Sequence, residues 1–263
     1  MIDLTGKWAL ITGASGGIGK DLAWLFAKDG ANLVLVARNA SRLSEVKDEI
    51  EKKQGVNVIT VVKDLTKLES ADEIFSELER EKISVSALVN NAGVGVFGDF
   101  SESNPEGIDK LLLLNIFALT RMTKLFLEKF AEKGGAILNV ASTAAFQPGP
   151  GMAVYYASKA YVVSFSEALA EELAGKGITV TCLCPGPTKT EFFDTVNMGK
   201  PFFLKVFGEM DSRRVALYGY NAIKNKKTLV VAGLFNRLTV FSVRFAPRKL
   251  IAKISSLLNR PSV

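Results

Sequence analysis

The chain has 263 residues, of which 48% are hydrophobic and 23% are charged. These proportions are typical of a globular protein and exclude an intrinsically disordered chain, and the length fits one large α/β domain. Histidine is absent, which excludes a Ser-His-acid catalytic triad and histidine-based metal sites, so we expect no metal.

The N-terminus and the cysteines indicate the cellular compartment. No signal peptide is visible, since Asp3 and Lys7 precede the first apolar run, and the apolar stretch Leu111–Thr120 is too short to span a bilayer. Cys182 and Cys184 alternate within one apolar run and are too close in sequence for an ordinary disulfide. We therefore expect buried thiols in a reducing compartment and a cytoplasmic protein.

The first elements in chain order predict a βαβ unit. An apolar strand over Lys7–Thr12 is followed by a glycine-rich turn, a helix that ends at Gly30, and a second strand over Ala31–Ala37. Glycines between strand and helix let a diphosphate approach the backbone N–H groups at the positive end of the helix. The turn therefore predicts a dinucleotide site.

The glycine spacing of this turn separates it from other motifs. It reads Gly13-x-x-x-Gly17-x-Gly19, not the usual Gly-x-Gly-x-x-Gly, and Lys20 is followed by Asp21 where a Walker loop needs Ser or Thr. Gly13-Ala-Ser-Gly-Gly17 also matches a hydrolase nucleophile elbow, but without histidine that match is a coincidence. A merely flexible loop is the alternative.

The end of the second strand indicates which dinucleotide binds. NAD sites usually place an acid there for the ribose 2′-hydroxyl, whereas an arginine favours the 2′-phosphate of NADP. Here the positions hold Ala37 and Arg38. The sequence therefore predicts NADP(H) rather than NAD(H), unless Arg38 is only a solvated loop charge.

The rest of the first 190 residues continues the alternation of strands and helices. Further strands are expected over Val56–Val62, Ala87–Asn90, Ala136–Ala141 and Ile178–Leu183, and further helices over Arg42–Lys53, Ala71–Arg80 and Leu111–Phe130. This alternation predicts an α/β fold, a single Rossmann-type doubly wound parallel sheet with helices on both faces and ligands at the carboxyl edge of the strands. Asn115 lies in an otherwise apolar stretch, so it is either a structural bridge or part of a site.

A Tyr-x-x-x-Lys pair follows the fifth strand. The helical pattern from Val154 onward places Tyr155 and Lys159 on one face, a turn apart, and Ser142 precedes that helix at the end of the strand. An ammonium one turn away is expected to lower the pKa of the phenol towards the working range of a general acid or base. An ordinary helix face is the alternative for this pair taken alone.

Together these motifs resemble the compact single-domain branch of the short-chain dehydrogenase/reductase family. The set comprises Thr12-Gly13-x-x-x-Gly17-x-Gly19, Asn90-Asn91-Ala92-Gly93, Asn115, Ser142, Tyr155-x-x-x-Lys159 and Pro185-Gly186. The match covers roughly residues 4–190, and Tyr155 comes thirteen positions after Ser142. Tyr156 is the wrong tyrosine, because it lies only three residues before Lys159.

The resemblance implies a role for each catalytic position. Tyr155 would exchange a proton with the substrate oxygen and Ser142 would hydrogen-bond that oxygen. Lys159 would bind the nicotinamide ribose and tune Tyr155, and Asn115 would hold a water on the proton-relay path. The implied cofactor-binding residues are Gly13, Ser15, Gly17, Ile18, Gly19, Arg38, Asp64, Leu65, Asn91, Ala92, Gly93, Tyr155, Lys159, Pro185, Gly186 and Thr188.

One position departs from the pattern of many NADP-preferring members. They carry a basic residue just before the middle glycine of the turn, where this chain has Gly16. Arg38 would act without that helper, so the preference for NADP over NAD is expected to be incomplete.

Beyond residue 190 the chain is expected to shape the substrate pocket and its surroundings. The segments Glu191–Phe193 and Pro201–Leu204, with Val206 and Phe207, are rich in aromatic residues and predict either a mobile lid over an apolar substrate or ordinary core packing. We therefore expect one domain over residues 1–263, in which 191–263 form the lid and a basic amphipathic C-terminal segment.

The C-terminal segment has an unusual charge. Residues 212–263 contain eleven Lys and Arg and no Asp or Glu, in a chain whose net charge is +6. Arg248–Arg260 predicts a helix with an apolar side flanked by cations. Such a helix fits contact with anionic lipid, with an acyl carrier, with a sister subunit of a homodimer or homotetramer, or with its own domain. Nucleic-acid binding is not expected.

These observations predict an NADP(H)-dependent oxidoreductase that interconverts a carbonyl and a secondary alcohol on an apolar, lipid-like or 3-oxoacyl substrate. A sugar-nucleotide epimerase-like enzyme is one alternative, although this chain is too short for the additional C-terminal domain such enzymes generally have. An NADP(H)-sensing binding protein with little turnover is the other.

Overall fold

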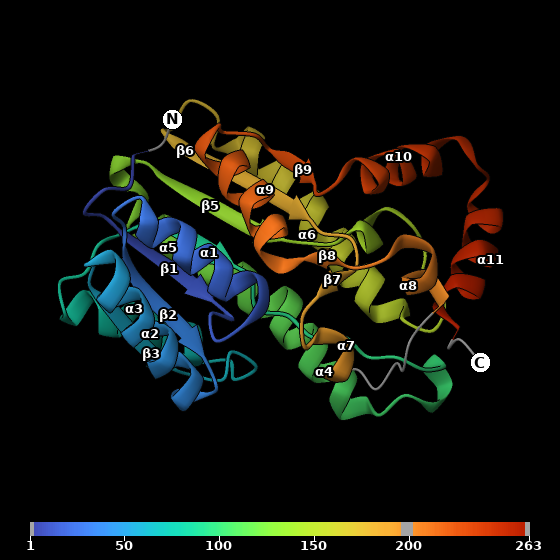
Figure 1. Ribbon diagram of the computed structural model, residues 1–263, viewed down its shortest axis with the longest axis horizontal. Helices are drawn as coiled ribbons and strands as arrows, with labels where there is room; N and C mark the ends of the chain where they lie inside the picture. The colour runs from blue at the N-terminus through green and yellow to red at the C-terminus, as the bar shows by residue number, and fades with distance from the viewer. Residues whose placement is uncertain (1–2, 196–201, 261–263) are drawn as a thin grey trace.

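The computed structural model describes residues 3–195 and 202–260. Its described residues form a parallel sheet in the order β3-β2-β1-β4-β5-β6-β9, which crosses the molecule in Figure 1. The strands are β1 Trp8–Thr12, β2 Asn32–Ala37, β3 Val58–Val62, β4 Val85–Asn90, β5 Gly135–Val140, β6 Ile178–Cys184 and β9 Leu229–Val231. The Rossmann-type doubly wound sheet expected from the sequence is confirmed.

The order of strands reverses between β1 and β4. Leu10 of β1 pairs with Val34 of β2 on one side and with Leu88 of β4 on the other. At such a reversal the connections leave towards opposite faces, so a crevice opens at the carboxyl ends of the two strands. The glycine-rich turn after β1 and the segment after β4 both lie at this crevice.

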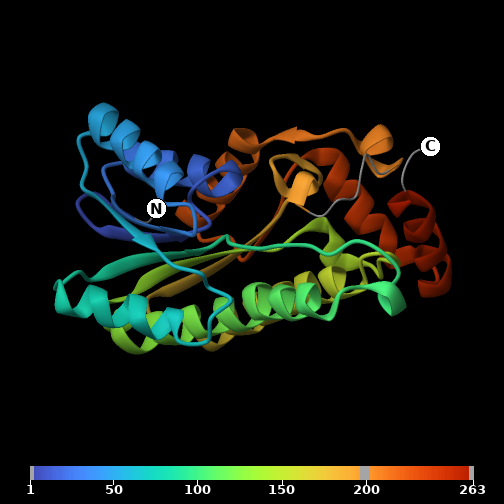
Figure 2. The ribbon, with the colours of Figure 1, turned by 90° about the horizontal axis from the view of Figure 1, so that it is seen from below.

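Helices cover both faces of the sheet, as Figure 2 shows. One face carries α1 Gly17–Lys28, α2 Ala40–Gln54 and α9 Ser212–Lys224, and the other carries α3 Ser70–Arg80, α5 Leu119–Lys129 and α6 Ala153–Glu172. Each layer buries its own core, around Phe26 in the first and Phe75 in the second. Because both faces are covered, the central strands are apolar on both sides.

The long helix expected over residues 111–130 differs in the structure. Helix α4 already begins at Pro105, with the Asn104 side chain accepting a hydrogen bond from the backbone N–H of Glu106. Between α4 Pro105–Leu112 and α5 lies a π-helical segment, η2 Leu113–Ala118. Periodicity alone does not reveal such a widened turn, and these turns are often found at functional sites.

The C-terminal region holds elements that the sequence analysis did not anticipate. Strand β9 and helix α9 were missed, as was a small parallel pair, β7 Thr188–Lys189 and β8 Met210–Asp211. The remaining helices are α7 Phe192–Thr195, α8 Phe202–Phe207, α10 Leu234–Ser242 and α11 Arg248–Asn259, with short 3₁₀ segments η1 Phe100–Glu102, η3 Ala131–Lys133, η4 Thr143–Phe146 and η5 Val243–Phe245. In both ribbon views α10 and α11 lie at one end of the molecule, away from α2 and α3.

Two further expectations can be compared with the structure. Cys182 and Cys184 are buried free thiols on β6, as expected. Among the described residues, no helix combines the length and the apolar character needed to cross a membrane.

Candidate active site

The turn between β1 and α1 forms a cradle that only glycine fits. Gly13 has a φ of 65°, and a Cβ there would lie 2.8 Å from Nδ2 of Asn91. A Cβ on Gly19 would lie 2.3 Å from the carbonyl oxygen of Gly13. No side chain of the described residues caps the N-terminus of α1, so its N–H groups can bind an anion such as a diphosphate.

Hydrogen bonds join this turn to the segment after β4. The Thr12 hydroxyl accepts from the backbone N–H groups of Asn91, at 2.9 Å, and Ala92, at 3.0 Å, and donates to the Val89 carbonyl oxygen at 3.2 Å. The Asn91 side chain donates to the Thr12 carbonyl oxygen at 2.9 Å. The two walls of the crevice therefore have a fixed separation.

Asn115 connects the crevice to helix α6. Its side-chain oxygen accepts from the backbone N–H of Val94 at 3.0 Å, and its amide donates to the Val94 carbonyl oxygen at 2.9 Å and to the Ser158 hydroxyl at 3.1 Å. The π-helical segment η2 carries this buried side chain between the two elements. A Cβ on Gly93 would lie 3.2 Å from Oδ1 of Asn115 and 3.4 Å from Nζ of Lys159, so a glycine at this position lets the three groups pack closely.

Tyr155, Lys159 and Ser142 meet at the start of α6. Nζ of Lys159 lies 5.8 Å from the centre of the Tyr155 ring and donates to the Val140 carbonyl oxygen at 3.0 Å. The Ser142 hydroxyl accepts from the backbone N–H of Ala144 at 3.1 Å. Because Ser142 has an extended backbone at the end of β5, its hydroxyl is held beside the phenol.

The electrostatic effect expected of Lys159 on Tyr155 is not found in this structure. Burial raises the pKa of the Tyr155 phenol well above its usual value, and a hydrogen bond with Ser142 opposes this shift only in part. The ammonium of Lys159 is not among the causes. Tyr155 is therefore protonated at neutral pH and holds a proton that it can donate.

Burial acts on Lys159 in the opposite direction. It lowers the pKa of the ammonium to about 8, because transfer from water disfavours the charged form of a base. At neutral pH most of the Lys159 side chains still carry a positive charge, which is directed at the carbonyl oxygen that ends β5.

A cavity of about 690 Å³ lies at the carboxyl edge of the sheet and contains most of the expected site residues. Fourteen of them line it: Gly13, Ser15, Gly17, Ile18, Arg38, Asn91, Ala92, Gly93, Ser142, Tyr155, Lys159, Pro185, Gly186 and Thr188. Residues from separate strands and turns of the fold therefore meet in one space.

Four expected residues do not line the cavity. Gly19 packs behind the turn, and Asn115 is buried behind Gly93. Leu65 is part of the core next to Phe75. Burial raises the pKa of the Asp64 carboxyl, but hydrogen bonds from Thr66 and the charges of Arg38 and Lys67 outweigh it, so that pKa is lowered.

Aromatic side chains form a wall of the cavity beside Tyr155. The Phe192 ring lies 5.3 Å from that of Tyr155, and Met152 packs with Phe192, Phe193 and Phe203. The predicted lid also included Pro201, which lies outside the described residues, as do the side chains of Val206 and Phe207.

Arg42 is a cavity residue that the sequence analysis missed. Its guanidinium lies 2.6 Å from a carboxylate oxygen of Glu191, and both side chains line the cavity together with Arg38. The pair joins the start of α2 to the segment that leads into α7. The only available signal was the position of Arg42, one helical turn after Arg38 near the N-terminus of the predicted helix.

Asn259 is a second cavity residue that was missed. This buried side chain of α11 accepts from the Tyr156 hydroxyl at 3.1 Å and donates to the Pro150 carbonyl oxygen at 2.9 Å. It attaches the last described helix to the loop before α6. Contacts over more than one hundred residues leave no signal in a single sequence.

The match to a family model decides the classification. The model described as short chain dehydrogenase matches residues 7–200. The chain belongs to the short-chain dehydrogenase/reductase family. This oxidoreductase is 33% identical over 260 residues to 17-beta-hydroxysteroid dehydrogenase type 3 from Mus musculus, and the match covers 97% of this chain and 84% of the mouse protein.

Solved structures with cofactors resemble this dehydrogenase/reductase closely. A short-chain dehydrogenase from Sphingobium yanoikuyae in complex with NADPH is 32% identical, with a TM-score of 0.82 and coverage of 93% of this chain and 94% of the other. A short chain dehydrogenase/reductase from Burkholderia phymatum in complex with NAD is 25% identical, with a TM-score of 0.83 and complete coverage of both chains. Relatives with the same fold therefore bind either dinucleotide.

Proposed function

We propose that this short-chain dehydrogenase/reductase interconverts a carbonyl and a secondary alcohol on an apolar substrate, with NADP(H) as its cofactor. The observation that carries the proposal is the buried, protonated Tyr155 phenol, which lies beside Ser142 at the junction of the glycine-lined crevice and the aromatic wall. A proton donor at that junction can reach an oxygen of a substrate that lies between the wall and the cofactor.

The residues at this junction divide the proton chemistry. In reduction, the Tyr155 hydroxyl donates its proton to the substrate oxygen, and the Ser142 hydroxyl holds that oxygen in place. The bound nicotinamide supplies the hydride. Lys159, whose ammonium lies 5.8 Å from the centre of the Tyr155 ring, would bind the nicotinamide ribose. Asn115, through Ser158 and the backbone of Val94, fixes the position of α6 against the crevice.

The residues that line the crevice fit a dinucleotide. The diphosphate would lie at the N-terminus of α1 against Gly13, Gly17 and Ile18, the adenosine near Asn91, and the nicotinamide near Gly186 and Thr188. Arg38 and Arg42 lie where β2 ends and α2 begins, and the one acid among the described residues of the cavity lining, Glu191, pairs with Arg42 and leaves Arg38 free for an anion. Two guanidinium groups favour the 2′-phosphate of NADP over the 2′-hydroxyl of NAD.

The aromatic wall supports an apolar substrate. Met152, Phe192, Phe193 and Phe203 supply apolar surface next to Tyr155, and a pocket of this kind binds a lipid-like ketone or a 3-oxoacyl chain better than a sugar. The similarity to a hydroxysteroid dehydrogenase agrees with a bulky apolar ketone.

Turnover separates this proposal from a cofactor-sensing protein. NADPH oxidation would be followed by the loss of its absorbance at about 340 nm, with a panel of steroid ketones, 3-oxoacyl thioesters and ketoses. Cofactor binding would be measured on the same samples. We expect turnover with an apolar ketone or thioester and little with ketoses. Tight NADPH binding without turnover on any member of the panel would contradict the proposal.

A further inference from the structure

A row of apolar side chains lies exposed along the outer side of α10. Leu234, Leu238, Phe241 and Phe245 follow one another at intervals of four, three and four residues and are between 57% and 76% exposed. This spacing puts them on one helical face. Isolated exposed apolar residues are common, but a continuous row on one face indicates an interaction surface.

Cations accompany this row without acidic partners. Arg237 and Arg244 project from the same helix and the 3₁₀ turn after it, and Arg248 and Lys249 begin α11. All four are exposed, and none forms an ion pair with any residue that the structure describes. Since residues 212–263 contain no Asp or Glu, this part of the chain cannot neutralise its own charge.

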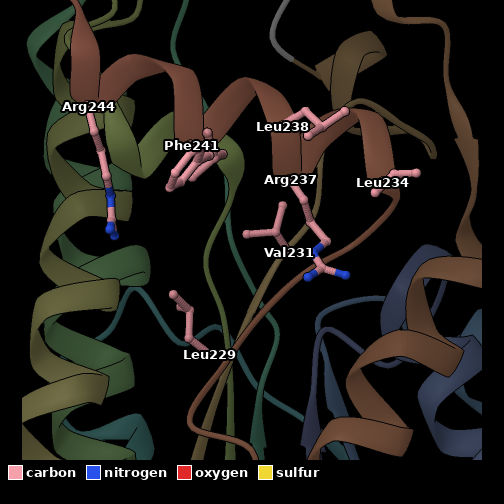
Figure 3. A pocket seen from close by; sticks show the side chains of 8 residues that line it. Leu229, Val231, Leu234, Arg237, Leu238, Phe241 and Arg244 are labelled. Atoms are coloured by element: carbon pink, nitrogen blue, oxygen red, sulfur yellow. The ribbon is translucent and has the colours of Figure 1, made fainter.

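A groove of about 380 Å³ lies between α10 and strand β9. Figure 3 shows Arg237, Phe241 and Arg244 directed from α10 towards the side on which Leu229 and Val231 of β9 lie. The groove is lined by apolar side chains with a guanidinium near each end. That combination matches a partner with negative charge at its surface and hydrocarbon beneath it.

Helix α11 extends the surface. Leu250, Ile254 and Leu257 are exposed at the same helical interval, and Lys253 is exposed beside them. Both ribbon views place α10 and α11 at the same end of the molecule. The other sides of these helices line the large cavity, through Asn236 and Thr239 on α10 and Ser255 on α11, and Ile254 reaches both the cavity and the outer surface.

We propose that the outer faces of α10, η5 and α11 form a docking surface for anionic lipid bilayers, which holds the protein at the membrane without spanning it. The docking surface consists of Leu234, Leu238, Phe241, Phe245, Leu250, Ile254 and Leu257 with Arg237, Arg244, Arg248, Lys249 and Lys253. The apolar side chains enter the boundary between headgroups and acyl chains, and the cations contact the lipid phosphates. The inference does not depend on the substrate class proposed above.

The charge of the docking surface argues against a second copy of this chain as its partner. A two-fold interface on α10 would bring Arg237 and Arg244 of both copies into one buried patch, with no acid from this segment to separate them. Burial of like charges without counterions is strongly unfavourable. An anionic bilayer supplies the counter-charges and the hydrocarbon together.

The test is co-sedimentation of the full chain with vesicles. Phosphatidylcholine vesicles that contain about one third phosphatidylglycerol are compared with pure phosphatidylcholine vesicles, at low and at high salt. We expect binding to the anionic vesicles that weakens with salt, and much weaker binding to the neutral ones. Absence of binding to anionic vesicles would overturn the proposal.

Two double variants separate the apolar contribution from the ionic one. Leu238→Ser with Phe245→Ser is expected to lower the vesicle partition coefficient at least tenfold on both vesicle types. Arg237→Gln with Arg244→Gln is expected to lower it roughly tenfold to thirtyfold on anionic vesicles only. Wild-type partitioning by either variant would place the membrane contact elsewhere and overturn the proposal.

Matched controls use exposed residues at other sites. Lys52→Gln with Lys176→Gln removes the same amount of charge from α2 and from the loop after α6, and Leu68→Ser removes an equally exposed leucine. Both controls should partition as the wild type does. All variants should keep the wild-type melting temperature, because their side chains are exposed.

Sedimentation velocity and a carrier-binding assay address the other partners. A dimer that Leu238→Ser with Phe245→Ser abolishes would assign the surface to contacts between copies of this chain. Retention on an acidic acyl carrier protein that Arg237→Gln with Arg244→Gln abolishes, without binding to vesicles, would assign it to that carrier. Either result would replace the membrane as the partner.

Discussion

Residues 3–190 and residues 191–260 differ in the pairing of their charged side chains and in the exposure of their apolar ones. In the first region, cations are paired across elements, as Arg121 is with Asp72 and Lys63 with Glu73. In the second region, no cation after Lys224 forms an ion pair among the described residues. Most of the large hydrophobic side chains exposed on the described surface also belong to the second region, although it is much the shorter.

This difference indicates that the two regions have different roles within one fold. In the first region, hydrogen bonds of Thr12, Asn91 and Asn115 fix the geometry of the crevice. The second region leaves apolar surface and charge exposed. We propose that the first region holds the reacting groups in a fixed geometry and that the second surrounds the substrate.

The largest expected effect tests whether the reaction depends on the first region. Tyr155→Phe removes the proton donor while the ring and its packing on Phe192 remain, so kcat with an apolar ketone should fall by about 10²- to 10⁴-fold. NADPH affinity should stay nearly unchanged, because only a hydroxyl is lost. Steady-state kinetics and fluorescence titration measure the two quantities.

The neighbouring tyrosine is the matched control for that variant. Tyr156→Phe removes the hydroxyl that bonds Asn259, not the one beside Ser142. It should keep most of the wild-type kcat. Equal losses in the two variants would show that the hydroxyl of Tyr155 has no special role.

The next effect concerns the buried ammonium group of Lys159 in the first region. Burial lowers the pKa of Lys159 to about 8 from its usual value of 10.5, so between these pH values the unfolded chain binds more protons than the folded one. The folded state therefore gains stability as the pH rises from 8 to 10.5, by about 3 kcal/mol if the whole shift is realised.

Lys159→Met should remove this gain. The difference in unfolding free energy between variant and wild type, from urea titrations without cofactor, should shift by about that amount in favour of the wild type over the same pH range. Lys52→Met, at an exposed position, should follow the wild type throughout. A pH-independent difference for Lys159→Met would mean that the ammonium is not desolvated.

A smaller effect tests whether Arg38 and Arg42, at the contact between the two regions, set the preference for NADPH over NADH. Arg38→Asp should weaken NADPH relative to NADH by roughly tenfold to hundredfold, because a charge-assisted contact becomes a repulsion. Arg42→Ala should shift the ratio less, since its guanidinium is shared with Glu191. Kd values for both dinucleotides measure the ratio, and Lys176→Ala should leave it unchanged. An unaltered ratio in Arg38→Asp would reduce Arg38 to a surface charge.

The smallest effect concerns the attachment of α11. Asn259→Ala leaves the buried Tyr156 hydroxyl without its partner, which should lower the unfolding free energy by about 1–3 kcal/mol. The KM for an apolar ketone should rise severalfold, because α11 lines the cavity. Leu257→Ala, on the exposed side of the same helix, should change neither value. No change in Asn259→Ala would mean that the helix is held by other contacts.

The same division explains what the sequence could predict. Strands β1 to β6 are largely apolar runs of five to seven residues, and buried parallel strands leave that signature. Strand β9, Leu229–Val231, is apolar as well, but it has only three residues and all three are half-buried, so its signal is weaker. Helix α9 was missed because no motif marks it, although it packs over the centre of the sheet next to α1.

In the site, local motifs were informative and long-range contacts were not. The spacing of Tyr155 and Lys159 fixes their shared helical face from sequence alone. The direction of the Tyr155 pKa shift does not follow from spacing. It depends on burial by Phe192 and by other residues that come close to α6 only when the chain folds. Arg42 was missed for the same reason, since its partner Glu191 is distant in the sequence.

The ion pair between Arg42 and Glu191 has a consequence for the order of events in a catalytic cycle. A guanidinium binds one carboxylate or phosphate group more strongly than it binds each of two at once. A second anion that reaches Arg42 therefore competes with the Glu191 side chain. Where that anion is the 2′-phosphate of a dinucleotide, its arrival loosens the tether of the chain that leads into α7. A dinucleotide that binds first would thus free the segment that leads into α7 before the ketone binds. The kinetics would then show a compulsory order, with the dinucleotide first and the ketone second.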